Sequence, residues 1–265
     1  MENITIGYLS WKRHDIFNQT LLSHKTNGLY DCILPENRLI FFQEINEIDV
    51  ALANKYECNY IGSKENVGIL NAFIALVENC KTDYFIFCEN DWLLIEKKND
   101  IMNVLLDCIE LISNGIANVI KLRHRTIPGN PIHALNVWNK NDCLNFPYKL
   151  ESLHWLKDTE INVYYQNIIQ QHTLRYLWFI TDIKHQLWSN NIFFADTHIL
   201  KNSILPLLKL NDINVNTSKY LGLEDVLINY DKYHDSNNKI ITNYKSNIKL
   251  AQGKGLFTHC DYILH

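Results

Sequence analysis

Short apolar runs alternate with amphipathic stretches over residues 4–95. The apolar runs have the length of buried strands, and the stretches between them carry apolar residues at helical spacing. This alternation is typical of successive βα units around a mostly parallel sheet. We therefore predict an α/β fold with a central sheet flanked by helices, whose first strands lie at residues 4–9, 38–43, 58–62 and 82–88.

The rest of the chain continues this pattern less regularly. Residues 126–188 are irregular and contain many His, Trp and Tyr residues, and long irregular segments in compact domains tend to be functional. No internal repeat and no linker divides the sequence, so we expect one domain over residues 1–265. The further predicted elements are a helix at 100–113, a strand at 117–125, a strand followed by a helix at 190–210, and a helix at 222–234.

Polar residues gather where the predicted strands end. Parallel strands place their carboxyl ends at one edge of the sheet, and open α/β sheets bind ligands at that edge. The run Glu89-Asn90-Asp91 directly follows a buried strand, where carboxylates are costly unless they are paired, hydrogen-bonded or bound to a metal. The residues predicted at this edge are Ser10, Gln43, Glu44, Asn66, Glu89, Asn90 and Asp91.

Composition excludes some classes of protein. The chain has 265 residues, of which 47% are hydrophobic and 20% charged, enough for a sizeable core. The net charge of −4 supplies no polycationic surface, so we expect no nucleic-acid partner. The seven cysteines are an odd number without a Cys-x-x-Cys pair, which argues against a disulfide framework or a cysteine zinc site.

The first residues, MENITIGYLSWKR, lack the basic segment, apolar core and cleavage site of a signal peptide. No apolar run approaches the length of a membrane span. The sequence therefore predicts a cytoplasmic protein without a transmembrane segment.

These motifs resemble those of GT-A fold glycosyltransferases, nearest in pattern to the inverting nucleotide-sugar transferases called family 2. The resemblance covers residues 4–95 and recurs at 222–225 and around His259. It implies a Rossmann-like GT-A domain in which residues 1–125 bind the nucleotide sugar, and residues 126–265 bind the acceptor and carry the catalytic base. A nucleoside-diphosphate sugar as donor, a glycan or other hydroxyl as acceptor, and inversion at the sugar carbon are likewise implied.

The resemblance also implies where the nucleotide binds. In the family, the opening strand and its loop, here IGYLSWKR, hold the base and ribose, and an Asn-x-Gly segment at a helix start contacts the nucleoside. Relatives often carry an aspartate pair after the second strand, where this chain has Gln43-Glu44, so base recognition is expected to differ from the usual uridine pattern. The implied nucleotide contacts are Tyr8, Ser10, Arg13, Gln43, Glu44, Asn66, Gly68, Glu89 and Asn90.

A metal site is implied at FCENDW, which stands where the family has its Asp-x-Asp motif. Mn²⁺ or Mg²⁺ held there neutralises the leaving diphosphate. Glu89 replaces the first aspartate, so Asp91 is the expected direct ligand and Glu89 a ribose or water-mediated contact. His259 resembles a histidine that completes the metal shell in some GT-A enzymes, and imidazole suits Mn²⁺ better than Mg²⁺. The alternative is a strand-end turn with solvated acids and a structural histidine.

The segment GLEDV resembles the Glu-Asp pair from which many family members take the catalytic base. Inverting transfer needs a carboxylate that removes the acceptor proton, and we assign this role to Asp225, with Glu224 second. The alternative is that both acids only complement the dipole of a helix first turn.

Two further alternatives remain open. A sugar-phosphate nucleotidyltransferase has a similar sheet but needs a glycine-rich loop after the first strand, and Ser10 to Arg13 contains no glycine. A degenerate transferase scaffold would bind glycan or protein without catalysis. Lys121, Arg123 and Arg125 alternate along one strand and either meet an anionic ligand or form a solvated face.

Overall fold

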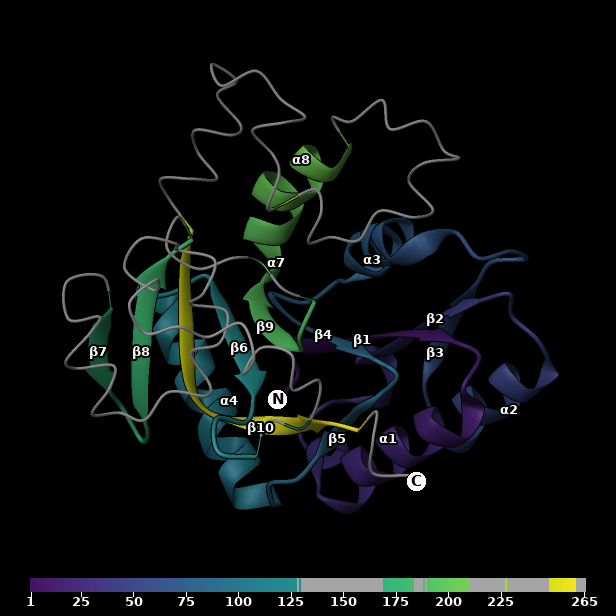
Figure 1. Cartoon of the computed structure of the whole chain (residues 1–265), viewed down its shortest axis with the longest axis horizontal. Helices are drawn as coiled ribbons and strands as arrows, with labels where there is room; N and C mark the ends of the chain where they lie inside the picture. Colours follow the sequence, from purple (N-terminus) through teal and green to yellow (C-terminus); the bar gives the residue numbers. More distant parts are fainter. Residues whose placement is uncertain are drawn as a thin grey trace.

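One sheet organises the computed structural model, which describes residues 1–127, 129, 169–183, 188, 190–209, 227 and 248–260. Within these ranges the sheet has ten strands in the order β3-β2-β1-β4-β9-β6-β10-β8-β7, with β5 paired to β10 beside this path (Figure 1). The strands are β1 Ile4–Trp11, β2 Arg38–Gln43, β3 Asn59–Gly62, β4 Tyr84–Glu89, β5 Trp92–Leu94, β6 Val119–Arg123, β7 Gln170–Thr173, β8 Leu177–Asp182, β9 Phe193–Asp196 and β10 Lys249–His259.

Helices connect and cover these strands. The longer ones are α1 to α4: α1, α2 and α3 occupy the amphipathic stretches between the first four predicted strands, and α4 matches the helix predicted at 100–113. No helix within the described ranges is both long and apolar enough to cross a membrane. The helices are α1 His14–Thr26, α2 Glu47–Lys55, α3 Gly68–Asn79, α4 Lys98–Ser113, α7 Thr197–Ile199 and α8 Leu205–Lys209, with a π-helical turn at Leu200–Ile204 and 3₁₀ turns at Leu29–Asp31 and Pro35–Asn37.

The predicted α/β class is confirmed. Strands β3, β2, β1 and β4 are neighbours and pair in parallel, as expected for consecutive βα units. Beyond β4 the sheet is mixed, because β9 runs antiparallel to both β4 and β6, and β10 runs parallel to β6 but antiparallel to β8. The largely parallel centre is thus extended by antiparallel strands.

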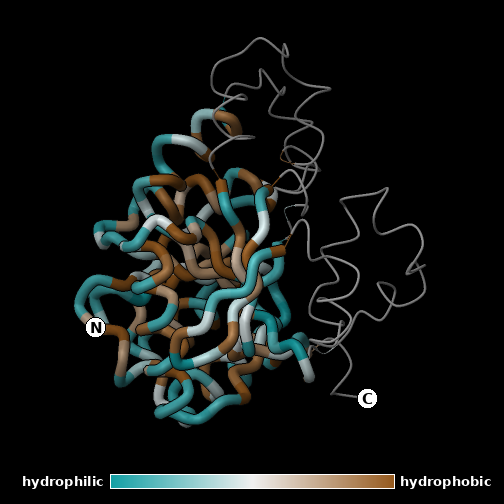
Figure 2. Tube along the Cα trace, turned by 90° about the vertical axis from the view of Figure 1, so that its left-hand side faces the viewer, coloured by the Kyte–Doolittle hydropathy of each residue, from teal (hydrophilic) through white to brown (hydrophobic). Residues whose placement is uncertain are grey.

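Two hydrophobic layers cover the two faces of the sheet. Ile6 and Tyr8 of β1 belong to the layer shared with α1, α2 and α4, whereas Leu9 belongs to the layer shared with α3 and α8. This is the alternation expected of a strand that is buried on both faces. The two sets of helices lie on opposite sides of the sheet in Figure 1, and hydrophobic segments run through the interior in Figure 2.

The entry into α2 follows from local chemistry. The side chain of Asn46 accepts hydrogen bonds from Ile48 N at 2.8 Å and Asp49 N at 3.3 Å, and Asp49 accepts one from Asn46 N at 2.9 Å. This reciprocal capping box satisfies the first amide groups of the helix. It ends the connection after β2 within a few residues of Gln43.

Strand β10 is not predicted by the sequence analysis, although it reaches two parts of the sheet. Its first half pairs with β6 and β8, and its last residues pair with β5. The register shifts between Gln252 and Phe257, where Gly255 has a φ of +76° and lies against the backbone of Arg123. A side chain there would collide with that backbone, so glycine permits the bulge that redirects the strand toward β5.

A chain of polar side chains crosses the core beneath β1. The hydroxyl of Tyr8 lies 2.7 Å from Nδ1 of His24 and 3.2 Å from the hydroxyl of Tyr30, and Nε2 of His24 lies 3.0 Å from the carbonyl oxygen of Trp92. A carbonyl can only accept, so Nε2 of His24 carries the proton and Nδ1 accepts from Tyr8. Burial lowers the pKa of His24 from 6.5 to about 4, which keeps the ring neutral at pH 7.

The position of Tyr8 bears on a predicted nucleotide contact. Its side chain is completely buried under α1, and its hydroxyl is engaged with His24 and Tyr30. Desolvation by that burial raises the pKa of the phenol well above 10. Tyr8 is therefore a core residue, and its side chain is not exposed toward the edge where the nucleotide is predicted to bind.

Asp107 on α4 is a second buried polar anchor. It accepts hydrogen bonds from Trp178 Nε1 at 2.8 Å, Tyr176 N at 3.0 Å and the Arg175 guanidinium at 2.8 Å. These donors surround the turn between β7 and β8, so one carboxylate holds that hairpin against α4.

We expect Asp107→Ala to lower the free energy of unfolding by about 3 kcal/mol, because it leaves several donors without a partner. Urea denaturation measures the change. Glu110→Ala is the control, since Glu110 is half exposed and also bonds Arg175, at 3.2 Å, and it should have little effect. Equal effects of the two substitutions would contradict the anchoring role.

We also expect a pH-dependent stability that originates at His24. The unfolded chain binds a proton at His24 below about pH 6.5, whereas the folded protein does so only near pH 4. The stability contributed by the neutral ring is thus complete above pH 6.5 and is lost as the pH falls toward 4. Between these values the wild type should lose about 1.4 kcal/mol per pH unit more than His24→Gln in urea denaturation. Parallel curves for the two proteins would contradict a buried neutral His24.

Candidate active site at the carboxyl edge of the sheet

The carboxyl ends of three strands meet at one edge. In the strand register, Trp11 of β1 lies opposite Gln43 of β2, and Leu9 of β1 lies opposite Glu89 of β4. Ser10, which is 1% exposed, sits between these pairs. The predicted gathering of polar strand-end residues at one edge is therefore observed.

Asp91 and His259, which are far apart in the sequence, meet at this edge. Oδ2 of Asp91 lies 3.5 Å from Nε2 of His259 and 3.1 Å from an amino group of the Arg13 guanidinium. The carboxylate is 10% exposed, so it is surrounded by protein on most sides. One acid, one imidazole and one guanidinium thus converge on the turn after β4.

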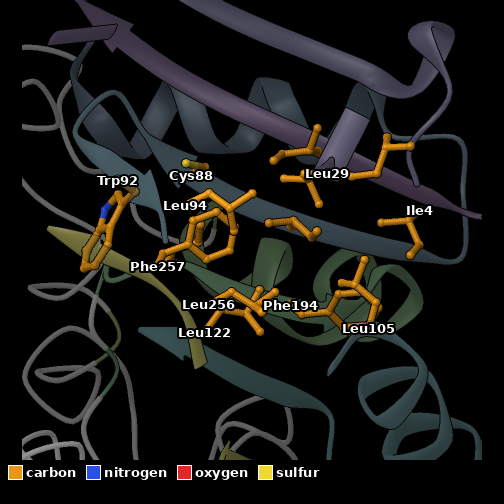
Figure 3. Packing of buried hydrophobic residues seen from close by; sticks show 14 of the residues in the cluster. Ile4, Leu29, Cys88, Trp92, Leu94, Leu105, Leu122, Phe194, Leu256 and Phe257 are labelled. Carbon is orange, nitrogen blue, oxygen red and sulfur yellow. The ribbon is translucent and has the colours of Figure 1, made fainter. Parts of the chain in front are cut away.

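The pairing of β5 with β10 produces this meeting. Trp92 lies opposite His259 in the antiparallel register, and Cys260 N donates to Asp91 O at 2.9 Å. The His259 ring packs edge-on against Trp92, with ring centroids 4.8 Å apart. Figure 3 shows Trp92 at one end of the core, followed by Leu94 and its partner Phe257. Asp91 and His259 are therefore held in place by the backbone pairing of β5 with β10 and by the packing of His259 against the Trp92 ring.

The residues present fit a divalent cation that binds together with a ligand. Oδ1 of Asp91 is buried and has no hydrogen-bond partner within the described residues, so it is available as a ligand. No group of three or more His, Cys, Asp or Glu side chains suited to a metal occurs in the described ranges. Mg²⁺ commonly binds through one or two carboxylates plus phosphate oxygens rather than in an all-protein cage. The histidine in this set favours Mn²⁺ over Mg²⁺.

The start of α3 is organised by Gln43 and Asn66. Oε1 of Gln43 accepts hydrogen bonds from Val67 N at 2.8 Å and Gly68 N at 2.9 Å, and Oδ1 of Asn66 also accepts from Gly68 N at 2.9 Å. Two amide donors identify this atom of Gln43 as the carbonyl oxygen. Gly68 has a φ of +83°, a conformation that other residues rarely adopt.

Strained backbone lies at the same edge. Lys12, Arg13 and Glu44 have φ values of 54°, 53° and 54°, although none of them is glycine. Each such residue costs of order 1 kcal/mol, and this kind of strain often occurs at functional sites. Lys12 and Glu44 form an ion pair of 3.0 Å that joins the turn after β1 to the turn after β2.

The other predicted residues are placed unevenly. Asn90 is 8% exposed and its carbonyl oxygen is held by Thr20 at 3.0 Å, while Glu89 is the half-buried last residue of β4. Glu224 and Asp225, the predicted base and its alternative, lie outside the described residues. The structure therefore describes the metal and nucleotide part of the prediction but not the catalytic base.

The basic residues of β6 were expected either to meet an anionic ligand or to form a solvated face, and the structure contradicts the second expectation. Lys121 and Arg123 are 4% and 5% exposed, so a solvated face is wrong for both. Arg123 donates to Asn191 Oδ1 at 3.0 Å and to Gly129 O at 3.1 Å, and its guanidinium lies 5.3 Å from the centre of the Trp92 ring. Arg123 therefore supports the tryptophan that follows Asp91.

Sequence reasoning missed the polar residues of α1. Thr20, Ser23 and His24 of α1 and its C-cap residue Asn27 all bond the backbone of residues 90–94. Their spacing on one helix face is the signal that identifies them, but it is informative only once the partner segment is known.

Comparisons with known proteins match at the level of structure. No protein-family model matches the chain, and a search of curated proteins gives no match either. TarS from S. aureus, residues 1–349, superposes with a TM-score of 0.51 at 12% identity, over 98% of this chain and 60% of that one. A second TarS structure gives 0.52 at 11% identity, over 98% of this chain and 37% of that one, so the chain spans well under two thirds of TarS.

A further match is glucosyl-3-phosphoglycerate synthase from Mycobacterium tuberculosis in complex with Mn²⁺, uridine diphosphate and glucosyl-3-phosphoglycerate. It has a TM-score of 0.50 at 11% identity and covers 99% of this chain and 74% of that one. At such low identity the likeness concerns the fold alone. The chain has the GT-A fold that its sequence motifs predict.

Proposed function

We propose that this protein is a metal-dependent glycosyltransferase that moves a sugar from a nucleoside-diphosphate sugar to an acceptor hydroxyl, with inversion. The observation that carries the proposal is the meeting of Asp91 and His259, at 3.5 Å, at the carboxyl edge of a GT-A sheet. The Mycobacterium tuberculosis synthase of similar fold was solved with Mn²⁺ and uridine diphosphate, which supports the same ligand classes here.

In this proposal, Asp91 and His259 hold Mn²⁺ or Mg²⁺. The ion, when bound, neutralises the negative charge that develops on the leaving diphosphate. The Arg13 guanidinium forms an ion pair of 3.1 Å with the Asp91 carboxylate. This planar group is suited to pair with diphosphate oxygens. Glu89 contacts the ribose directly or through water.

The nucleoside subsite is assigned to the ends of β1, β2 and β4 and the start of α3. Where relatives often carry an aspartate pair, this subsite has the amide side chain of Gln43 and the strained turn at Glu44. The remaining residues assigned to this subsite are Ser10, Asn66, Gly68 and Asn90.

Asp225, or Glu224 in its place, is proposed to remove the proton of the acceptor hydroxyl on the face opposite the diphosphate. The part that follows residue 125 is proposed to bind a glycan or another hydroxyl acceptor.

A nucleotidyltransferase fits less well. Strand β1 ends at Trp11 and α1 begins at His14, so only Lys12 and Arg13 connect them. Two residues without glycine leave no room for a loop that wraps a triphosphate. Oδ1 of Asp91 supports ligand binding at this edge, because a buried carboxylate oxygen without a partner in the described part is costly unless a ligand uses it. A nucleotide-sugar hydrolysis assay with Mn²⁺ separates an enzyme from a scaffold that binds without catalysis.

We expect a nucleoside diphosphate to raise the melting temperature only when Mn²⁺ is present, because the diphosphate and Asp91 otherwise repel each other. At a ligand concentration of 100 times Kd the stabilisation is about 2.7 kcal/mol. Thermal shift measurements with UDP, GDP, CDP and dTDP, each with Mn²⁺ or with EDTA, test this and identify the base. The same shift in EDTA would remove the metal from the proposal.

Two conservative substitutions separate donor binding from chemistry. Asp91→Asn removes a ligand charge, so both Mn²⁺-dependent donor affinity and turnover should fall. Asp225→Asn should leave donor affinity nearly unchanged and lower the transfer rate by about 10² to 10⁴, the usual contribution of a positioned base. Calorimetry and a transfer assay measure the two effects.

The Glu224→Gln variant is the matched control for Asp225. If it loses transfer while Asp225→Asn keeps it, the base is Glu224. If both variants remain fully active, neither acid is the base.

A further inference from the structure

One face of α1 carries polar side chains where a core helix normally carries apolar ones. Thr20 and His24 are completely buried and lie one turn apart, on the face that also buries Phe17 and Leu21. Thr20 Oγ1 donates to Asn90 O at 3.0 Å. His24 Nε2 donates to the carbonyl oxygen of Trp92, also at 3.0 Å. Asp91 therefore lies between two residues whose carbonyl groups are held by α1.

The same helix face continues to the strand that follows. Ser23 Oγ accepts from Leu94 N at 3.0 Å, and Asn27 Nδ2 donates to Leu94 O at 2.6 Å. Positions 20, 23 and 24 of α1 and the C-cap position 27 have the i, i+3, i+4, i+7 spacing of a single helix face. This face thus bonds the backbone along residues 90–94.

The carbonyl of Asp91 itself is held from the other side. It accepts from Cys260 N at 2.9 Å, at the end of β10. Three successive carbonyl groups are therefore fixed from two sides: those of Asn90 and Trp92 by α1, and that of Asp91 by Cys260, the residue after β10. A turn restrained on both sides leaves Asp91 with only its side-chain rotation.

Packing alone does not explain the buried polar groups. Burying a hydroxyl or an imidazole costs free energy that apolar residues of the same volume would not lose. Both Thr20 and His24 bond the turn and not one another, and Tyr8, with its hydroxyl 2.7 Å from His24 Nδ1, fixes the tautomer that donates to Trp92. The buried polar atoms of Thr20 and His24 thus bond the backbone beside Asp91 and not other groups of α1.

We propose that Thr20 and His24, with Tyr8 behind His24, are positioning residues that hold Asp91 where its carboxylate meets a divalent cation. They act through the backbone on either side of Asp91 and do not contact the ion. This inference rests on the proposed function. Partners that orient a metal ligand typically affect metal affinity by 10- to 100-fold when they are removed.

The test uses Mn²⁺ as the probe, titrated into the full chain at pH 7.5 both alone and together with UDP, GDP, CDP or dTDP, and followed by EPR of the free ion. Thr20→Val deletes the hydroxyl at nearly constant volume, and we expect it to weaken Mn²⁺ binding about tenfold. Thr26→Val is the matched control on the same helix, because among the described residues the Thr26 hydroxyl bonds the helix carbonyls of Leu22 and Ser23 and not the turn. It should bind Mn²⁺ like the wild type, and Thr20→Ser should restore binding to within about threefold of it.

A second pair of variants tests the role of Tyr8. Tyr8→Phe is expected to weaken Mn²⁺ binding, whereas Tyr56→Phe, which removes a buried hydroxyl bonded to Asn18, should not. Hydrogen exchange of the Cys260 amide supplies a readout that needs no metal. It should become faster in Thr20→Val and stay unchanged in Thr26→Val.

The outcomes separate this inference from the proposed function. If the wild type binds Mn²⁺ and Thr20→Val binds it equally well, the positioning role is wrong and the proposed function stands. If the wild type binds no Mn²⁺, with or without UDP, GDP, CDP or dTDP, the metal-dependent function fails and the positioning role fails with it. Unchanged Cys260 exchange in Thr20→Val would overturn the restraint on the turn by itself.

Discussion

The candidate site depends on one backbone interaction, the antiparallel pairing of β5 with β10. Strand β5 spans only Trp92–Leu94, yet its pairing places Trp92 opposite His259 and lets Cys260 N donate to the Asp91 carbonyl. Without this pairing the imidazole and the carboxylate would belong to unrelated parts of the chain. The bulge at Gly255 shifts the register of β10 against β6, and beyond it Phe257 lies beside both Arg123 of β6 and Leu94 of β5.

The charge at the turn is balanced by its surroundings. Asp91 is a mostly buried acid, and such a group requires a positive partner or a strong donor set. The Arg13 guanidinium is a positive partner 3.1 Å from Oδ2 of Asp91, and Nε2 of His259 lies 3.5 Å from the same oxygen. The second carboxylate oxygen, Oδ1, has no partner within the described residues. This combination of a compensated and an uncompensated oxygen explains how the folded protein tolerates the acid and still offers it to a cation.

The edge of the sheet is also where the backbone is strained. Left-handed residues at Lys12, Arg13 and Glu44 shorten the connections after β1 and β2, so α1 starts two residues after its strand. The short connection holds α1 close to the turn after β4, within reach of its side chains. The strained turn after β1 thus helps to place α1 where its hydrogen bonds restrain the backbone beside Asp91.

The sequence by itself determined the α/β class, the helices α1 to α4 and the edge at which β1, β2 and β4 end, because hydrophobic periodicity and turn residues are local signals. It also singled out Asp91 and His259 through their resemblance to a known pattern. Only the tertiary structure decided that Tyr8 is a core residue, that Lys121 and Arg123 are buried, and that Thr20 and His24 bond the turn beside Asp91. These facts depend on contacts between segments distant in sequence, such as α1 with β5 and β5 with β10. A side chain's partner across such a contact leaves no local pattern in the chain.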